Sequence, residues 1–257
     1  KPNIGCFDLF HSAHKYIPID YDNSIYVGDA AGRLNDWKPG IKKDFSCADR
    51  KFAFNIKLKF YTPEEYFLNE EPTNKYFMET FDEFKNSQTN LLNTIHKSEN
   101  KHFKPEIVIL IGYPGCGKSR FSKKFYQKYN LINRDTLKTK GKCKKLVKTH
   151  VKNNNNIIID NTNPDIETRK EYIEIAKSNN YYIKCYYFNI GLDISKHLNN
   201  LRMKLFNKDK IPEIVYRIFN KKFEYPSVNE GFDEINEVLF VPDFINEEHE
   251  KEFYMLS

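Results

Sequence analysis

Runs of apolar residues alternate with amphipathic stretches over the second half of the chain. The run EIVILI is almost wholly apolar, which is typical of a strand buried on both faces. A Gly-rich turn and a segment with Phe121, Phe125 and Tyr126 on one helical side follow it. The pattern predicts strands at 106–111, 156–160 and 181–188, with helices at 118–129 and 165–177. Such alternation predicts a parallel α/β sheet.

The first part of the chain has the same character up to about residue 68. Residues 24–27 (SIYV) predict a short strand that runs into the Gly-rich loop 28–33. Residues 49–58 have apolar positions at helical spacing, and Thr62 followed by Pro63 predicts the start of another helix. We therefore expect a second, smaller α/β region ahead of the main sheet.

Between these regions the sequence becomes polar and loses strand character, which favours a linker or a docking helix. The expected organisation is an α/β region at 1–68, a linker or docking segment at 69–104, and a second domain at 105–257.

Composition predicts a globular protein, since 40% of the residues are hydrophobic and 15% aromatic. The longest clean apolar run, 107–111, is far shorter than the roughly 20 residues of a membrane-spanning helix. No secretory leader is expected either. The five cysteines are widely spaced without a C-x-x-C pair, so we expect neither a disulfide framework nor a zinc site, but reduced thiols in a reducing compartment.

The net charge of +6 is concentrated in one segment. Residues 118–222 carry 25 basic and 9 acidic side chains, a local charge of +16, whereas residues 223–257 carry one Lys and ten acids. A field of this size attracts polyanions, and the acidic end of the chain is one candidate partner. Taken alone, this charge is explained equally well by solvated surface lysines that bind no partner.

A nucleotide-binding motif follows the strand at 106–111. The sequence GYPGCGKS matches G-x-x-x-x-G-K-[ST] between an apolar strand and an amphipathic helix, the context that this motif requires. Its glycines allow backbone N–H groups to face phosphates, while the lysine reaches the β- and γ-phosphates and the serine hydroxyl binds Mg²⁺. The expected nucleotide-binding residues are Gly112, Gly115, Cys116, Gly117, Lys118 and Ser119.

Hydrolysis by water is poorly supported by the rest of the sequence. The string NKDK at 207–210 has Lys where the guanine-reading motif N-K-x-D requires Asp. Asp160, at the end of a predicted strand, is followed by Asn161 and not by a second, water-polarising acid. Phosphoryl transfer to an acceptor hydroxyl therefore remains.

Such a transfer needs a base, a metal and cations around the phosphate. Asp135 is predicted at the carboxyl edge of the sheet as the base, with Arg134 holding a phosphate; helix capping is its alternative role. Asp160 is a candidate Mg²⁺ ligand, direct or through water, with turn formation as the alternative. Arg202 is the candidate lid cation.

The motifs GYPGCGKS, NRDTL, IIIDNTNPD and KHLNNLR resemble the kinase domain of the eukaryotic polynucleotide kinase 3′-phosphatase family, which heals DNA ends. The front motifs VGDAAGR, DW-x-PG, KKDFSCADR-x-FA and TPEEYFL resemble the second half of that family's haloacid-dehalogenase-type phosphatase domain. The resemblance covers nearly the whole chain. It implies a P-loop kinase domain with a parallel sheet, preceded by the C-terminal part of a HAD-like, Rossmannoid phosphatase domain.

By this resemblance, Lys118 and Ser119 bind the phosphates of ATP and Mg²⁺, and Asp135 is the general base for the DNA 5′-hydroxyl. Arg202 matches the lid arginine, with Lys204 as a second candidate because the surrounding helix matches loosely. In the phosphatase part, the resemblance assigns Lys1 as the lysine that stabilises the phospho-aspartate and Asp29 as the Mg²⁺-binding acid. Asp49 is a weaker match to the second acid.

The sequence also departs from the family. It contains no D-x-D-G-T string, which carries the phosphatase nucleophile, and no phosphopeptide-binding module. A covalent mechanism needs that attacking carboxylate. We therefore expect the 257 residues to be a fragment whose 3′-phosphatase activity belongs to the full-length parent, with repair-scaffold partners recruited by the missing module.

The sequence thus predicts an ATP- and Mg²⁺-dependent polynucleotide 5′-hydroxyl kinase of DNA end repair, monomeric and, by resemblance, nuclear. The expected partners are nucleic acid 5′ ends, with DNA favoured over RNA, and the seven lysines of residues 138–152 are candidates for contacting phosphates beside the acceptor. The alternatives are a P-loop kinase of a small-molecule or RNA acceptor and a non-catalytic scaffold for nucleic acid ends.

Overall fold

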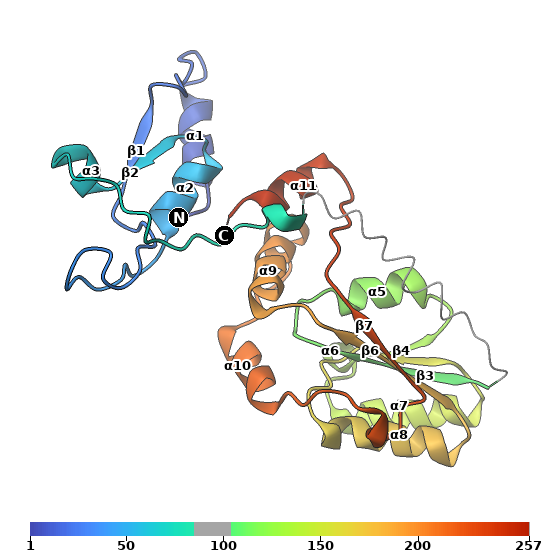
Figure 1. The fold of residues 1–257 in the computed structure, drawn as a ribbon. Helices are drawn as coiled ribbons and strands as arrows, with labels where there is room; N and C mark the ends of the chain where they lie inside the picture. The colour runs from blue at the N-terminus through green and yellow to red at the C-terminus, as the bar shows by residue number, and fades with distance from the viewer. Residues whose placement is uncertain (85–103, 257) are drawn as a thin grey trace. The chain divides into compact units, whose positions relative to one another are not determined.

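The computed structural model describes residues 1–84 and 104–256. They form two compact units, one built from residues 1–84 and 244–256 and the other from residues 104–243 (Figure 1). Of the predicted linker at 69–104, residues 85–103 lie outside the described residues. Within the described ranges, no helix combines the length and the apolar character that crossing a bilayer requires.

The second unit contains a five-stranded, all-parallel sheet in the order β4-β5-β3-β6-β7. Its strands are β3 (Glu106–Ile111), β4 (Asn130–Ile132), β5 (Ile157–Ile159), β6 (Tyr182–Phe188) and β7 (Glu234–Val238). The central strand β3 is buried at every position, as its continuous apolar sequence predicts. The predicted α/β class and parallel sheet are confirmed.

Helices cover both faces of this sheet (Figure 1). Ile107, Ile109 and Ile111 of β3 pack in a cluster with α7 (Lys140–Lys152) and α8 (Ile166–Ser178), whereas Val108 and Leu110 pack in a second cluster with α5 (Lys118–Phe125). Alternate residues of a strand point to opposite faces, so one apolar run serves two cores. The remaining helical segments of the unit are α6 (Arg134–Leu137), α9 (Leu192–Phe206), α10 (Glu213–Lys222) and η3 (Val228–Glu230).

Helix α5 ends at Phe125, four residues before the predicted end at 129. The chain leaves the helix because the side chains of Tyr126 and Tyr129 pack in the apolar cluster between α5 and the sheet. Tyr126 donates a hydrogen bond to the hydroxyl of Tyr186 at 2.8 Å, and Tyr129 donates one to Glu106 at 2.5 Å. These buried partners outweigh the local helical pattern.

The first unit has a two-stranded parallel sheet of β1 (Ile25–Val27) and β2 (Lys59–Tyr61), connected through α2 (Ala48–Asn55). Thr62 and Glu65 form a capping box at the start of α3 (Pro63–Phe67), with Pro63 at its first turn, which confirms that predicted helix start. The unit also holds α1 (Gly5–Ala13), η1 (Asp82–Phe84) and α11 (Glu247–Tyr254).

The C-terminal segment belongs to this first unit, which differs from the expected second domain at 105–257. Asn55 donates to the carbonyl oxygen of Leu256 at 2.8 Å and accepts the N–H of Leu256, also at 2.8 Å. Phe253 is 1% exposed and packs against the rings of Phe81 and Phe84. These contacts join residues far apart in sequence, and no local pattern in residues 244–256 predicts them.

Candidate active site

The loop between β3 and α5 carries the G-x-x-x-x-G-K-S motif and has an unusual backbone. Gly112, Gly115 and Gly117 have φ angles of 152°, 80° and 98°, which L side chains rarely adopt. A Cβ on Gly112 would also lie 2.8 Å from the Cβ of Phe188. The glycines are therefore required for the loop to lead into the N-terminus of α5, an arrangement that binds phosphate groups.

Lys118 opens α5 and folds its side chain back over this loop. Its Nζ donates to the carbonyl oxygen of Gly112 at 2.9 Å and lies 3.5 Å from the Sγ of Cys116. Burial raises the pKa of the Cys116 thiol, so the sulfur remains neutral beside the cation. Ser119, the next residue, is exposed in the first turn of α5. Both residues thus lie where the loop enters α5, and their roles in binding phosphate and Mg²⁺ stay predictions.

Asp160 and Asn133 connect the ends of the neighbouring strands β5 and β4. The Nδ2 of Asn133 donates to the backbone oxygen of Asp160 at 2.9 Å and to its Oδ2 at 3.3 Å. Asp160 is 4% exposed, and it follows the strand that pairs with β3. The Asp160 carboxylate is thus held at the edge from which the phosphate-binding loop leaves the sheet, where ligands of open α/β sheets bind.

Asp135 lies in the first turn of α6, and its backbone is fixed by its neighbours. The Oδ1 of Asn133 accepts the N–H groups of Asp135 at 2.8 Å and of Thr136 at 3.2 Å, and the Oδ1 of Asn161 accepts the N–H of Arg134 at 2.8 Å. Asn133 is therefore the cap of α6, and the capping role considered for Asp135 is not the one it has. The Asp135 carboxylate is exposed and makes no hydrogen bond or ion pair with any residue in the described ranges.

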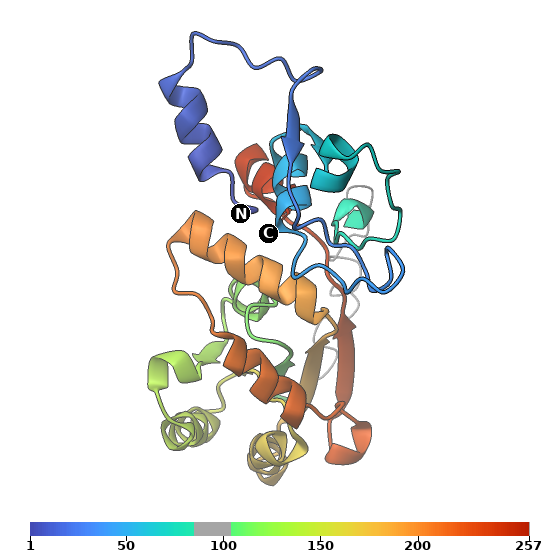
Figure 2. The same ribbon diagram turned by 90° about the vertical axis from the view of Figure 1, so that its left-hand side faces the viewer.

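Helices α9 and α10 lie across the carboxyl edge of the sheet (Figures 1 and 2). A Cβ on Gly115 would lie 3.2 Å from the backbone oxygen of Ser195 in α9 and 3.3 Å from the hydroxyl of Tyr216 in α10. Tyr113 of the phosphate-binding loop donates a hydrogen bond to Asn220, and its ring centroid lies 4.6 Å from that of Phe219. The two helices therefore contact the loop directly.

Arg202, the candidate lid cation, is half-buried in α9. Burial raises the pKa of Tyr216 to about 12, although the positive charge of Arg202 opposes this shift. Lys204, the second candidate, is exposed on the same helix. The structure places Arg202 on an element that contacts the phosphate-binding loop, and its catalytic role stays a prediction.

Arg169 is a site residue that the sequence analysis did not identify. It is fully buried, and its guanidinium donates to both carboxylate oxygens of Glu230 at 2.7 and 2.9 Å. It also donates to the backbone oxygens of Asn163 and Pro164. The preceding residue of that loop, Thr162, accepts a hydrogen bond from the N–H of Gly112 through its backbone oxygen at 3.2 Å. Arg169 therefore holds the loop after β5, which in turn contacts the phosphate-binding loop.

Asn199 is a second residue that the sequence analysis missed. It is 2% exposed, and its amide donates to the backbone oxygen of Ile211 at 3.0 Å and accepts the Ile211 N–H at 3.1 Å. These bonds fix the connection between α9 and α10. Buried polar side chains on helices carry no distinctive sequence signal, so only the structure identifies Asn199 and Arg169.

In the first unit, the structure brings Lys1 and Asp49 together, with Nζ 2.8 Å from Oδ1. The Asp49 carboxylate also accepts the N–H of Ala30 at 3.0 Å. Burial alone would raise the pKa of Asp49, but the hydrogen bonds from Lys1 and Ala30 outweigh it and hold that pKa below its usual value. A Cβ on Gly28 would lie 2.6 Å from the Asp49 carboxylate, so glycine is required there.

Asp29, the other predicted metal-binding acid, follows Gly28 at the end of β1 and is exposed. Its carboxylate forms no hydrogen bond or ion pair within residues 1–84 and 104–256. Those ranges contain no group of three or more His, Cys, Asp and Glu residues that could by itself hold a metal ion. The metal-binding roles of Asp29, Asp49 and Asp160 stay predictions.

Two family models match the chain. Residues 1–67 match a family described as polynucleotide kinase 3 phosphatase, and residues 107–226 match one described as an AAA domain. Among solved structures, Kti12 of Chaetomium thermophilum aligns with a TM-score of 0.42 and 14% identity, over 59% of this chain and 100% of that one.

Curated relatives match along almost the whole sequence. A bifunctional polynucleotide phosphatase/kinase of Schizosaccharomyces pombe is 38% identical over 93% of this chain and 57% of its own length. A putative bifunctional polynucleotide phosphatase/kinase of Acanthamoeba polyphaga mimivirus is 36% identical over 95% of this chain and 63% of its own length. The chain thus spans about three fifths of these relatives, and by sequence it belongs to the bifunctional polynucleotide phosphatase/kinase family.

Proposed function

We propose that the second unit transfers the γ-phosphate of ATP to the 5′-hydroxyl of a polynucleotide. The observation that carries this proposal is the exposed Asp135 carboxylate, which has no partner in the described ranges although its backbone is fixed by Asn133. It stands at the same sheet edge as the phosphate-binding loop, separated from it by β5. The names of the relatives, which describe polynucleotide phosphatase/kinases, supply the acceptor class.

The residues at this edge have different roles in phosphoryl transfer. The loop glycines and Lys118 bind and orient the phosphates, and the carboxylate of Asp135 accepts the proton of the attacking hydroxyl. Arg202 is on a helix that contacts the loop. Its positive charge stabilises the negative charge that the phosphoryl oxygens carry during transfer. Ser119 and Asp160 would hold Mg²⁺, which supplies charge neutralisation when bound.

A γ-labelled ATP assay with several acceptors tests this function. The purified chain is expected to label an oligonucleotide that has a 5′-hydroxyl and to leave unlabelled the same oligonucleotide with a 5′-phosphate. Labelling of small alcohols in preference to the oligonucleotide would show a metabolite kinase instead. Binding of the oligonucleotide without any transfer would show a non-catalytic scaffold.

We further propose that Lys1, Asp29 and Asp49 form part of a 3′-phosphatase site. The ion pair of Lys1 with Asp49 and the adjacent position of Asp29 beside Gly28 support this proposal. Their contribution depends on a nucleophilic carboxylate that the D-x-D-G-T motif would supply and that these 257 residues do not contain.

A further inference from the structure

Helix α7 is strongly basic. It carries six lysines and no acidic residue. Its first turn has lysines but no acid, which opposes the helix dipole, and like charges four residues apart repel each other. A bound polyanion would relieve both effects. The helix begins shortly after α6 in the chain, and its first lysine, Lys140, is five positions after Asp135.

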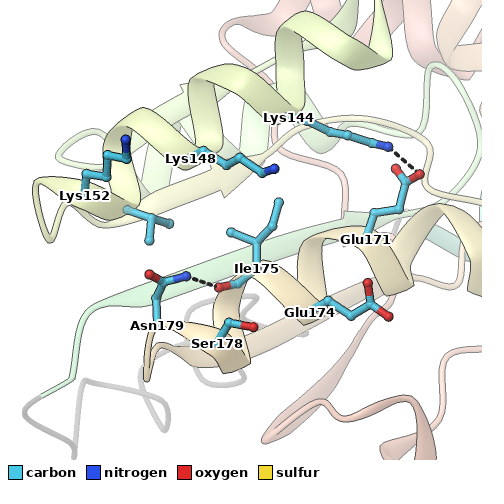
Figure 3. Close-up of a pocket in the computed structure, with 9 residues that line it drawn as sticks. Lys144, Lys148, Lys152, Glu171, Glu174, Ile175, Ser178 and Asn179 are labelled. Atoms are coloured by element: carbon cyan, nitrogen blue, oxygen red, sulfur yellow. Dashed lines mark hydrogen bonds and ion pairs between the residues drawn. The ribbon is translucent and has the colours of Figure 1, made fainter.

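Three of these lysines, spaced four residues apart, line a groove of about 600 Å³ between α7 and α8. We call Lys144, Lys148 and Lys152 the α7 lysine stripe. Val151 and Ile175 also line the groove (Figure 3). A charged wall with apolar groups beside it suits a sugar–phosphate backbone, which presents both charge and an apolar sugar face.

The acids near the stripe leave two of its lysines unneutralised. Lys144 forms an ion pair with Glu171 across the groove (Figure 3), and Glu174 pairs with Lys170 of its own helix at 3.8 Å. Lys148 and Lys152 are exposed and form no ion pair within the described ranges. Figure 3 shows Lys148 extending over the groove above Ile175.

Several acids of the C-terminal part of the second unit have partners away from the stripe. Three acids of this part pair with other cations: Asp243 with Arg120 and Lys124 at 3.2 and 2.7 Å, Glu230 with the buried Arg169, and Glu234 with Lys184 at 3.6 Å. These three acids are therefore engaged at α5, α8 and β6, and Lys148 and Lys152 have no acidic partner among the described residues.

We propose that the α7 lysine stripe binds the phosphate backbone of the polynucleotide several nucleotides away from the reacting 5′ end. At about 1.5 Å per residue, Lys144 to Lys152 spans about 12 Å, or three to four nucleotides of one strand. A helix that runs from the Asp135 edge toward the start of β5 would guide the strand along the side of the sheet. The identity of the polyanion rests on the proposed function, whereas the charge geometry does not.

Binding of a fluorescein-labelled duplex of about 20 base pairs, measured by anisotropy at several salt concentrations without ATP, tests this proposal. Two neutralised phosphates contribute a log–log slope of about −1.8, so the double variant K148Q/K152Q should have a slope shallower by that amount and bind up to about 60-fold more weakly at 0.1 M salt. The matched control K123Q/K128Q removes two exposed lysines that lie outside α7 and α8, and it should bind like the wild type. The variant K148R/K152R should retain binding.

An unchanged slope in K148Q/K152Q would overturn the proposal. An equal loss of affinity in both glutamine variants would overturn it too, because binding would then depend only on the overall positive charge. Poly-L-glutamate that competes as well as the duplex at equal charge would overturn the choice of nucleic acid. Since the assay contains no ATP, its outcome is separate from phosphoryl transfer. Stripe-dependent binding without transfer would reject the kinase proposal alone, whereas transfer with unchanged binding in K148Q/K152Q would reject the stripe alone.

Discussion

Replacing Arg169 with Met is expected to destabilise the second unit severely and to weaken nucleotide binding. The guanidinium is fully buried, and its partner Glu230 has a side chain that is 5% exposed. Removing one member of a buried, hydrogen-bonded ion pair leaves the other charge without compensation, which costs about 3–5 kcal/mol. The backbone oxygens of Asn163, Pro164 and Glu224 lose a donor at the same time.

Urea unfolding followed by two signals measures this effect. Far-UV circular dichroism reports mainly the helix-rich second unit, whereas the single tryptophan, Trp37, reports the first. With a denaturant slope of about 2 kcal/mol/M, the circular dichroism midpoint should fall by roughly 1.5–2.5 M. The Trp37 transition should stay unchanged. Affinity for MgATP should also fall, because the loop that Arg169 supports bonds to Gly112.

The adjacent Lys170 provides a matched control. Its ion pair with Glu174 joins two side chains that are 68% and 64% exposed, so Lys170→Met should cost at most about 1 kcal/mol. Equal midpoint shifts in the two variants, or a shift below about 0.5 M for Arg169→Met, would refute the assignment of Arg169 as the support of this loop.

Four further predictions concern single residues. Lys118→Ala should abolish measurable MgATP binding in calorimetry, because the loop loses its phosphate-facing cation. Asn133→Ala should cost about 1 kcal/mol of unfolding free energy through loss of the α6 cap and should lower the transfer rate. Asp29→Asn should leave that rate unchanged, since it lies in the other unit. Because folding lowers the pKa of Asp49, its contribution to stability should be complete above about pH 4 and be lost below, as measured by Trp37 fluorescence.

The main sheet could be predicted from the sequence because its signals are local. The run 106–111 is apolar throughout since β3 is covered on both faces, and the strand–loop–helix context of GYPGCGKS identified the phosphate-binding loop. Thr62 and Pro63 marked the start of α3 through capping chemistry, which acts over one helical turn.

The features that the sequence analysis missed depend on long-range contacts. The mixed polar sequence of β7 acquires its place only by pairing with β6, and no strand was predicted there. The return of residues 244–256 to the first unit depends on Asn55, about two hundred positions earlier. Arg169 and Asn199 look like ordinary helix residues until their buried partners are known.

The candidate site was predicted in outline because its signals, like those of the main sheet, are local. The loop glycines, Lys118, Ser119, Asp135 and Asp160 lie next to recognisable strand ends, and the order of the strands brings those ends to one edge. The sequence left open whether Asp135 was a base or a helix cap. The structure assigns the cap to Asn133, which leaves the Asp135 carboxylate available.

The central claim is that the Asp135 carboxylate accepts the proton of a polynucleotide 5′-hydroxyl, and single-turnover transfer of labelled γ-phosphate by Asp135→Asn tests it most directly. The substitution keeps the shape of the side chain, so MgATP affinity should stay within about twofold of the wild type. Transfer should slow by about 10²- to 10⁴-fold, the usual contribution of a general base. A transfer rate within about threefold of the wild type, at unchanged MgATP affinity, would contradict the account.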